Sequence, residues 1–169
     1  MKHWVTTVFA SLAVVLSACM GEEPISSDPV GDTLRHVADL HAQVRKQYPV
    51  SSIQQYKVIT GDLISAGLMP KGFVKKSKAT NAWDGRVVIQ VFPANAWGAG
   101  VPPTINYVIE SIPKADCSRL IGMLGQQTDW KVFQINIEPS KKVHTALPIV
   151  GDDGCTDGIN NIGYTVIAE

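Results

Sequence analysis

The spacing of apolar residues changes near Arg86, and this change most constrains the fold. Before Arg86, apolar residues recur at intervals of three and four, as in a helix with one buried face. After it, short runs rich in β-branched and aromatic residues favour strands, at residues 86–92, 104–111, 130–137 and 163–168. The sequence therefore predicts an α+β fold, with N-terminal helices packed on an antiparallel sheet.

The first predicted helix has an apolar stripe and a charged one. It begins at Asp32, whose side chain can act as N-cap, and ends at Tyr48, because Pro49 disfavours helical backbone before it. The apolar positions are Leu34, Val37, His41, Val44 and Tyr48, and the positions expected to face water are Arg35, Asp39, Arg45 and Lys46. The apolar stripe is expected to dock on the sheet of the same molecule.

Two further helices are predicted. One begins near Ser51 or Ser52 and ends at Gly67, which suits the left-handed conformation of a C-cap. The other opens with Pro113 at its first position, between the second and third strands. Its buried face is expected to carry Cys117, Leu120, Ile121 and Leu124.

The start of the chain is typical of an export signal. Lys2 and His3 precede an apolar run at residues 5–16, the usual length of a secretory core. As a helix this run spans roughly 18 Å, too short for the ~30 Å hydrocarbon layer of a bilayer. Glu22, Glu23 and Pro24 stop any extension of the run, so we expect no permanent membrane span.

Residues 16–19, Leu-Ser-Ala-Cys, resemble the lipobox of bacterial lipoproteins. The resemblance implies that the signal peptide 1–18 is removed and that Cys19 receives a lipid such as palmitate. The alternative is an ordinary cleaved signal with an incidental cysteine. Met20 after the cysteine, by resemblance to the enterobacterial sorting rule, favours the outer membrane. Residues 19–31 contain prolines and glycines without apolar periodicity, so they are predicted to tether a single domain, residues 32–169.

If Cys19 is lipidated, Cys117 and Cys155 remain as a pair. An exported protein meets an oxidising compartment, so a disulfide between them is the default expectation. A metal pair or a catalytic thiol is the alternative, but the chain lacks close C-x-x-C spacing and a histidine beside either cysteine.

Charge and motifs argue against two function classes. The chain has 15 basic and 15 acidic residues, which does not suit a nucleic-acid binder held by a broad positive field. It contains no G-x-S-x-G, no H-E-x-x-H and no phosphate-binding glycine loop, and His36 and His41 lie on different helix faces. We therefore expect no enzyme, no cofactor and no metal site.

Possible partner contacts are few. Trp97, in the sequence NAWGAG, is equally well explained as a core residue or as a contact. A cluster of Lys71, Lys75, Lys76 and Lys78 can touch anionic lipid headgroups or simply form a solvated loop. Trp83 is expected to pack on the sheet, while Asp84 and Gly85 turn the chain into the first strand.

Four segments, in their order and spacing, resemble the globular domain of type IVb pilins, including the PilS-like group. They are YKVITGDLISAGLMP (56–70), NAWDGRVVIQV (81–91), YVIESIPKADCSRLIGML (107–124) and GDDGCTDG (151–158). The resemblance implies a pilin-like head with a C-terminal region stapled by a disulfide between Cys117 and Cys155. The chain departs from the family after Gly21, where polar residues replace the apolar filament helix, and at Asp84, where a glycine is usual.

These observations predict a lipid-anchored protein of the bacterial envelope. The resemblance implies a structural or assembly role, through binding of pilus or secretion-system subunits. The alternative is an independent envelope binding or adhesion module that uses the same scaffold, since a fold does not fix a function.

Overall fold

The computed structural model describes residues 28–47, 52–126, 131–145, 149 and 151–168. The predicted signal peptide 1–18, Cys19 and most of the predicted tether lie outside these residues. The elements are α1 (Pro29–Gln47), β1 (Lys57–Val58), α2 (Thr60–Ser65), η2 (Lys71–Phe73), β2 (Val74–Lys75), β3 (Lys78–Ala79), β4 (Val87–Phe92), β5 (Thr104–Pro113), α3 (Lys114–Leu124), β6 (Val132–Glu138), β7 (Lys142–His144) and β8 (Ile159–Ile167). None of the helices in the described part is long and apolar enough to span a bilayer.

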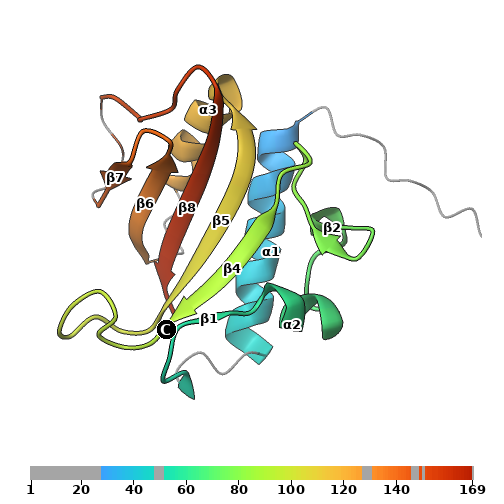
Figure 1. Cartoon of the computed structure of the whole chain (residues 1–169), viewed down its shortest axis with the longest axis vertical. Helices are drawn as coiled ribbons and strands as arrows, with labels where there is room; N and C mark the ends of the chain where they lie inside the picture. The colour runs from blue at the N-terminus through green and yellow to red at the C-terminus, as the bar shows by residue number, and fades with distance from the viewer. Residues whose placement is uncertain (1–27, 48–51, 127–130, 146–148, 150, 169) are drawn as a thin grey trace, which may run out of the picture.

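The main sheet is antiparallel, with strand order β1-β4-β5-β8-β6-β7, while β2 and β3 form a separate hairpin. Helices α1 and α3 lie behind the main sheet in the view of Figure 1, so both cover the same face. The predicted mixture of helices and an antiparallel sheet is confirmed.

Buried and partly exposed side chains alternate along β4, and this alternation distinguishes the two faces of the sheet. Val87, Ile89 and Val91 are buried toward the helices, whereas Val88, Gln90 and Phe92 are partly exposed on the opposite side. We call this opposite side the outer face. The register pairs Ile89 with Tyr107 and Gln90 with Asn106, which places Asn106 on the outer face as well.

Helix α1 begins three residues before the predicted start, so the predicted N-cap at Asp32 is wrong. The cap is Asp28, whose Oδ1 accepts a hydrogen bond from the Gly31 amide at 3.0 Å and one from Arg119 of α3 at 2.7 Å. Asp32 instead pairs with Arg35 at 2.8 Å. Residues 29–31 of the predicted tether therefore belong to the helix.

The predicted stripes of α1 are confirmed within the described residues. Val37, His41 and Val44 are buried, Leu34 packs partly buried against the core, and Tyr48 lies outside the described residues. The predicted water-facing residues are all exposed: Arg35, Asp39, Arg45 and Lys46. The helix thus docks on its own sheet.

The second predicted helix is much shorter than expected. Only α2 is helical near its predicted C-terminal end, and Lys57 and Val58 instead form β1 at the sheet edge. The Ile59 amide donates to the Ile89 carbonyl oxygen at 2.9 Å, so this backbone belongs to the sheet. The predicted helix end is confirmed, because Gly67 has φ +69° and its amide donates to the Ile64 carbonyl oxygen.

The four predicted strands are present as β4, β5, β6 and β8, with small shifts at their ends. Strand β5 continues to Pro113, which precedes α3 as its N-cap rather than occupying its first position. The predicted buried face of α3 is confirmed at Cys117, Leu120, Ile121 and Leu124. Cys117 forms the predicted disulfide with Cys155, which ties α3 to the segment before β8.

The turn before β4 is built around Asn81. Its side-chain oxygen accepts hydrogen bonds from the amides of Trp83 and Gly85, both at 2.9 Å, and its side-chain nitrogen donates to the Glu110 carbonyl oxygen. Asp84 takes the left-handed conformation, with φ +58°. Trp83 is partly buried, and its indole nitrogen donates to Asp116 at 2.8 Å. The predicted turning role of Asp84 is confirmed, whereas the described contacts of Trp83 are with the core and with Asp116 of α3.

Candidate protein-contact surface

Trp97 belongs to an aromatic cluster at one end of the outer face. The cluster consists of Tyr56, Phe92, Trp97 and Phe133, and the centroid distances between neighbouring rings are 5.0, 4.7 and 6.0 Å. Trp97 is 36% exposed and Tyr56 is 51% exposed. Trp97 therefore combines the two predicted roles: one part of its ring is packed as in a core, and another part faces water, where it can contact a partner.

The loop between β4 and β5 fixes the position of Trp97. Its indole nitrogen donates to the Thr104 hydroxyl oxygen at 2.8 Å. The Asn95 side-chain oxygen accepts a hydrogen bond from the Gly100 amide at 2.8 Å, while Gly98 and Gly100 have φ of +133° and +83°. Glycine reaches such angles without steric cost, so the tight loop holds the indole on the sheet.

A row of polar side chains crosses the outer face beside the cluster. The Gln90 amide nitrogen donates to the Tyr56 hydroxyl at 3.0 Å, and the Asn106 amide nitrogen donates to the Gln90 side-chain oxygen at 2.8 Å. The Thr165 hydroxyl donates to the Asn106 side-chain oxygen at 3.1 Å. Because these side chains donate and accept hydrogen bonds among themselves, each is held in one orientation, and the row links β4, β5 and β8.

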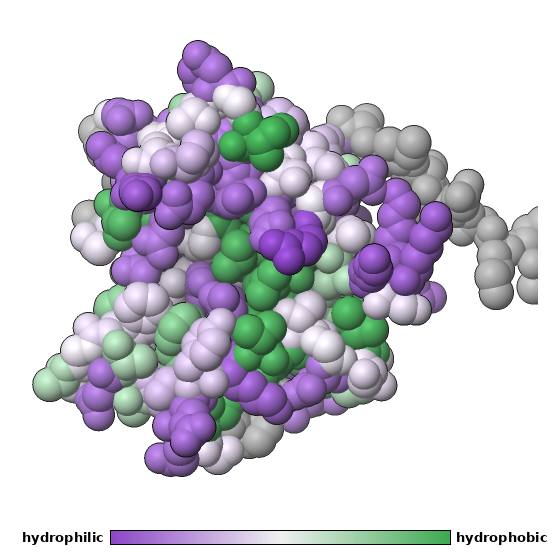
Figure 2. Space-filling model, in the orientation of Figure 1, coloured by the Kyte–Doolittle hydropathy of each residue, from purple (hydrophilic) through white to green (hydrophobic). Residues whose placement is uncertain are grey.

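The centre of the outer face is apolar. Val88 and Val108 are directly opposite each other on β4 and β5, and both are partly exposed. Figure 2 looks onto this face and shows a strip of hydrophobic residues over β4 and β5, bordered by hydrophilic ones. The outer face thus combines aromatic rings, aliphatic side chains and ordered amides, a composition that suits protein contact.

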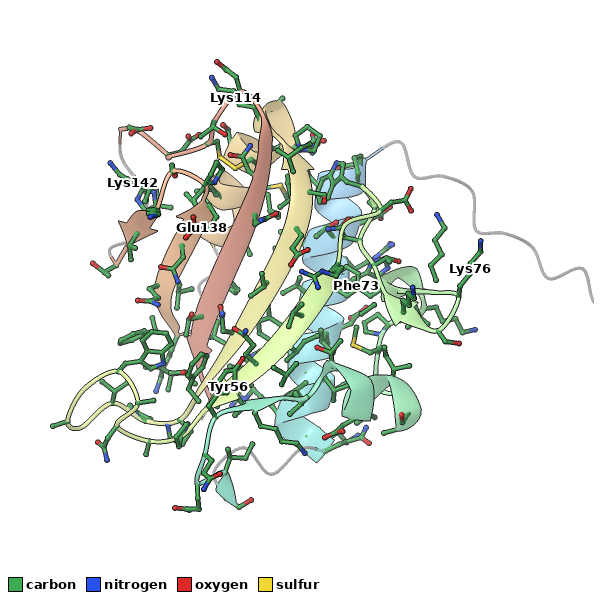
Figure 3. All side chains as sticks on the ribbon, viewed as in Figure 1. Tyr56, Phe73, Lys76, Lys114, Glu138 and Lys142 are labelled. Atoms are coloured by element: carbon green, nitrogen blue, oxygen red, sulfur yellow. A yellow bond between two sulfur atoms is a disulfide. The ribbon has the colours of Figure 1, made fainter. Side chains whose placement is uncertain are left out.

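The predicted lysine cluster lies elsewhere. Lys71 is in η2, Lys75 and Lys78 are in β2 and β3, and Lys76 is in the turn between them. In Figure 3 Lys76 lies at one side of the molecule and Tyr56 at the lower end of the sheet. The structure therefore does not bring the lysines together with the aromatic cluster of Trp97.

A polar cleft of about 700 Å³ lies between α1 and residues 67–72. Its lining includes Arg35, His36, Asp39 and Lys71. Within the described ranges, no group of three or more histidine, cysteine or acidic side chains is placed to hold a metal ion. The cleft opens beside the contact between α1 and Phe73, where the His36 and Phe73 rings meet.

One buried titratable pair lies on the inner side of the sheet. His41 Nδ1 is 2.9 Å from the Tyr107 hydroxyl oxygen, and the two rings meet edge to face. Burial, reinforced by the charge of Arg45, lowers the pKa of His41 to about 4. Burial raises the pKa of Tyr107 well above its ordinary value. This pair joins α1 to β5 as an uncharged contact.

Sequence reasoning identified Trp97 but not its partners in the cluster. The sequence predicts a helix at Tyr56 and a strand at Phe133, without placing either ring beside Trp97. Phe92 shares the alternation of Val88 and Gln90, so the β4 pattern could have placed it on the outer face.

Comparison with protein-family models, curated proteins and solved structures finds no match to this chain. Its function is therefore inferred from its own residues.

Proposed function

We propose that the protein is a lipid-anchored envelope protein whose type IVb-pilin-like head binds pilus or secretion-system subunits. The lipobox-like residues 16–19 support an anchor on Cys19, and Met20 supports the outer membrane. A long amphipathic helix packed on one face of an antiparallel sheet, together with the Cys117–Cys155 disulfide, supports the pilin-like head.

The observation that carries the binding role is the aromatic cluster on the outer face. Helices α1 and α3 cover the other face, so the rings of Tyr56 and Trp97 are presented to a partner. Tyrosine and tryptophan dominate protein interfaces because they bury a large area and lose few rotamers. Hydrogen bonds already hold both side chains, so binding would order little more.

A photo-crosslinking amino acid placed at Tyr56 in living cells tests the binding role. We expect crosslinks to pilus or secretion-system subunits, identified by mass spectrometry, and a loss of tenfold or more when Trp97→Ala is added, as for a central aromatic residue. The same amino acid at Ile159, which is 60% exposed at the start of β8, serves as the control. Identical crosslinks from both positions, or none from Tyr56, would contradict the proposal.

The anchor is tested separately. Mass spectrometry of the mature protein should find Cys19 at its N-terminus with acyl chains attached, and Cys19→Ser should release the protein from membranes. A mature chain that begins elsewhere and carries no acyl group would overturn the anchor.

A second candidate, an independent envelope binding or adhesion module, is favoured by the row of Gln90, Asn106 and Thr165. Gln90 is partly exposed beside the aromatic rings and could bond a polar ligand that stacks on them, while the buried Asn106 and Thr165 hold Gln90 in place. Crosslinks from Tyr56 to a surface receptor, and not to assembly subunits, would select this function.

A further inference from the structure

The hairpin of β2 and β3 concentrates positive charge on a small exposed projection. We call residues 74–79 the basic hairpin. Its lysines are Lys75, Lys76 and Lys78, and Lys71 precedes it by one turn of η2. All four lysines are exposed, and Val74 beside them is 36% exposed. Charge and apolar surface therefore occur together at this projection.

The hairpin holds its lysines together at a local cost. Lys75 and Lys78 are directly opposite each other, and like charges in such cross-strand pairs destabilise a hairpin. The turn residues Lys76 and Ser77 have φ of +50° and +61°, where glycine or asparagine is usual. Strained backbone that is retained against local preference is more frequent at functional sites. The pattern indicates a binding role for the charge.

Little of this charge is neutralised. Lys75 Nζ lies 2.6 Å from Asp84 Oδ1 in an exposed ion pair. Among the described residues, no acidic side chain is within ion-pair distance of Lys76 or Lys78. Figure 3 shows Lys114 and Lys142 on other parts of the molecule, where Asp157 and Asp152 respectively accompany them. Lys76 and Lys78 therefore add two charges to the hairpin that no described acidic side chain neutralises.

The base of the hairpin is packed firmly against α1. Phe73 is fully buried, and its ring meets the His36 ring edge to face at a centroid distance of 5.1 Å. A Cβ at Gly72 would lie 1.9 Å from the His36 ring, so this close contact requires glycine. The hairpin is thus a fixed part of the head.

This packing places the hairpin near the end of α1 that leads to the expected anchor. His36 lies seven residues after Pro29, roughly 10 Å along the helix at 1.5 Å per residue. Cys19 precedes Pro29 by ten residues, which span at most about 35 Å when extended. A lipid on Cys19 would keep this end of the head close to the bilayer.

We propose that the basic hairpin binds the anionic phospholipid headgroups of the membrane that carries the protein. The proposal depends on the proposed anchor in one respect only: the lipid on Cys19 is what brings the basic hairpin close to that membrane. An anionic surface attracts each nearby lysine by about 1 kcal/mol, roughly a fivefold enrichment per residue, and salt screens the attraction. Lys76 and Lys78 alone would therefore enrich the docked state about 25-fold over a neutral surface. Exposed Val74 adds apolar contact at the headgroup boundary.

Lysine acetylation of the full chain on vesicles tests this proposal. The protein is reconstituted into phosphatidylcholine vesicles with or without phosphatidylglycerol, and modification rates are read by mass spectrometry. We expect Lys76 and Lys78 to react at least about fivefold more slowly on the anionic vesicles, with the difference removed by high salt. Lys142, on β7, should react equally on both and serves as the internal control.

Matched variants separate the hairpin from general charge effects. Lys76→Gln/Lys78→Gln should abolish the protection of Lys71 and Lys75, whereas Lys141→Gln/Lys142→Gln, with the same charge change, should leave it intact. Equal rates on both vesicles, or equal slowing at every lysine, would overturn the proposal. Mass spectrometry of the same sample reads the lipid on Cys19, so a lipidated chain without protection refutes the hairpin alone. A protected chain without lipid refutes only the anchor.

Discussion

His41 joins α1 to the sheet, and its ionisation affects this docking. It is 4% exposed and contacts the hydroxyl of Tyr107, which is also buried, so a charged imidazole would lose its hydration there. Burial and the nearby Arg45 accordingly lower the pKa of His41 to about 4 from an ordinary value of 6.5. Between pH 6.5 and about 4, the folded protein therefore keeps His41 neutral, whereas His41 of the unfolded chain binds a proton.

Stability should consequently fall as pH drops from 6.5 to about 4, the window between the unfolded and folded pKa of His41. The loss can reach about 3 kcal/mol, at ~1.4 kcal/mol per unit of pKa difference. Urea unfolding across this window measures it, and His41→Gln should flatten the dependence. His144→Gln, on β7 away from α1, is the control and should keep the slope. An unchanged slope in His41→Gln would contradict this account.

Gly85 is a second residue with a specific steric role. A Cβ there would lie 2.0 Å from the Glu110 carbonyl oxygen, so Gly85→Ala must push the turn away from β5. We expect a loss of roughly 1–3 kcal/mol in the free energy of unfolding, as for overpacked sites. Gly122→Ala in α3, where nothing lies within 4 Å, should instead stabilise the protein by up to about 1 kcal/mol. Equal effects of the two substitutions in thermal unfolding would count against the steric role of Gly85.

At the scale of elements, alternation and helical spacing predicted the main sheet strands and α1 because each has one clearly apolar face. The same reasoning failed for residues 52–59, where Ile53 and Ile59 fit a helical stripe. That segment contributes the two-residue edge strand β1, whose Lys57 and Val58 are both exposed and carry no burial pattern. Pairing with β4 decided its conformation, and such tertiary pairing is not encoded in local spacing.

The candidate contact surface was predictable only in part for a related reason. Trp97 stands out in a loop rich in glycine, but Phe133, which contacts Trp97, and Tyr56, which contacts Phe92, are both distant from it in sequence. They meet because β1 and β6 reach the same end of the outer face. Strand order decides this meeting, and the local sequence of each strand does not determine strand order.

The disulfide acts between elements, since it joins α3 to the segment before β8 across 38 residues. Closing a loop of that length should stabilise the fold by roughly 3–4 kcal/mol on the chain-entropy model. The double variant Cys117→Ser/Cys155→Ser should lose this amount in urea unfolding, and wild type under reducing conditions should show a similar loss. The reductant should leave the double variant unchanged. No loss in either case would mean that the disulfide contributes little to stability.

For the whole molecule, the burial of the α1 stripe predicts the state of the head in solution. Val30, Val37, Leu40 and Val44 are at most 1% exposed, so the stripe has no surface left for a second molecule. We therefore expect residues 24–169 to sediment as a monomer at micromolar concentration. If residues 24–169 form an oligomer instead, two variants show which surface is responsible. Trp97→Ser would restore the monomer if the aromatic cluster drives association, whereas Val44→Asp should unfold or associate the head by opening the stripe. A stable oligomer that persists in Trp97→Ser would show that α1 serves an interface between molecules.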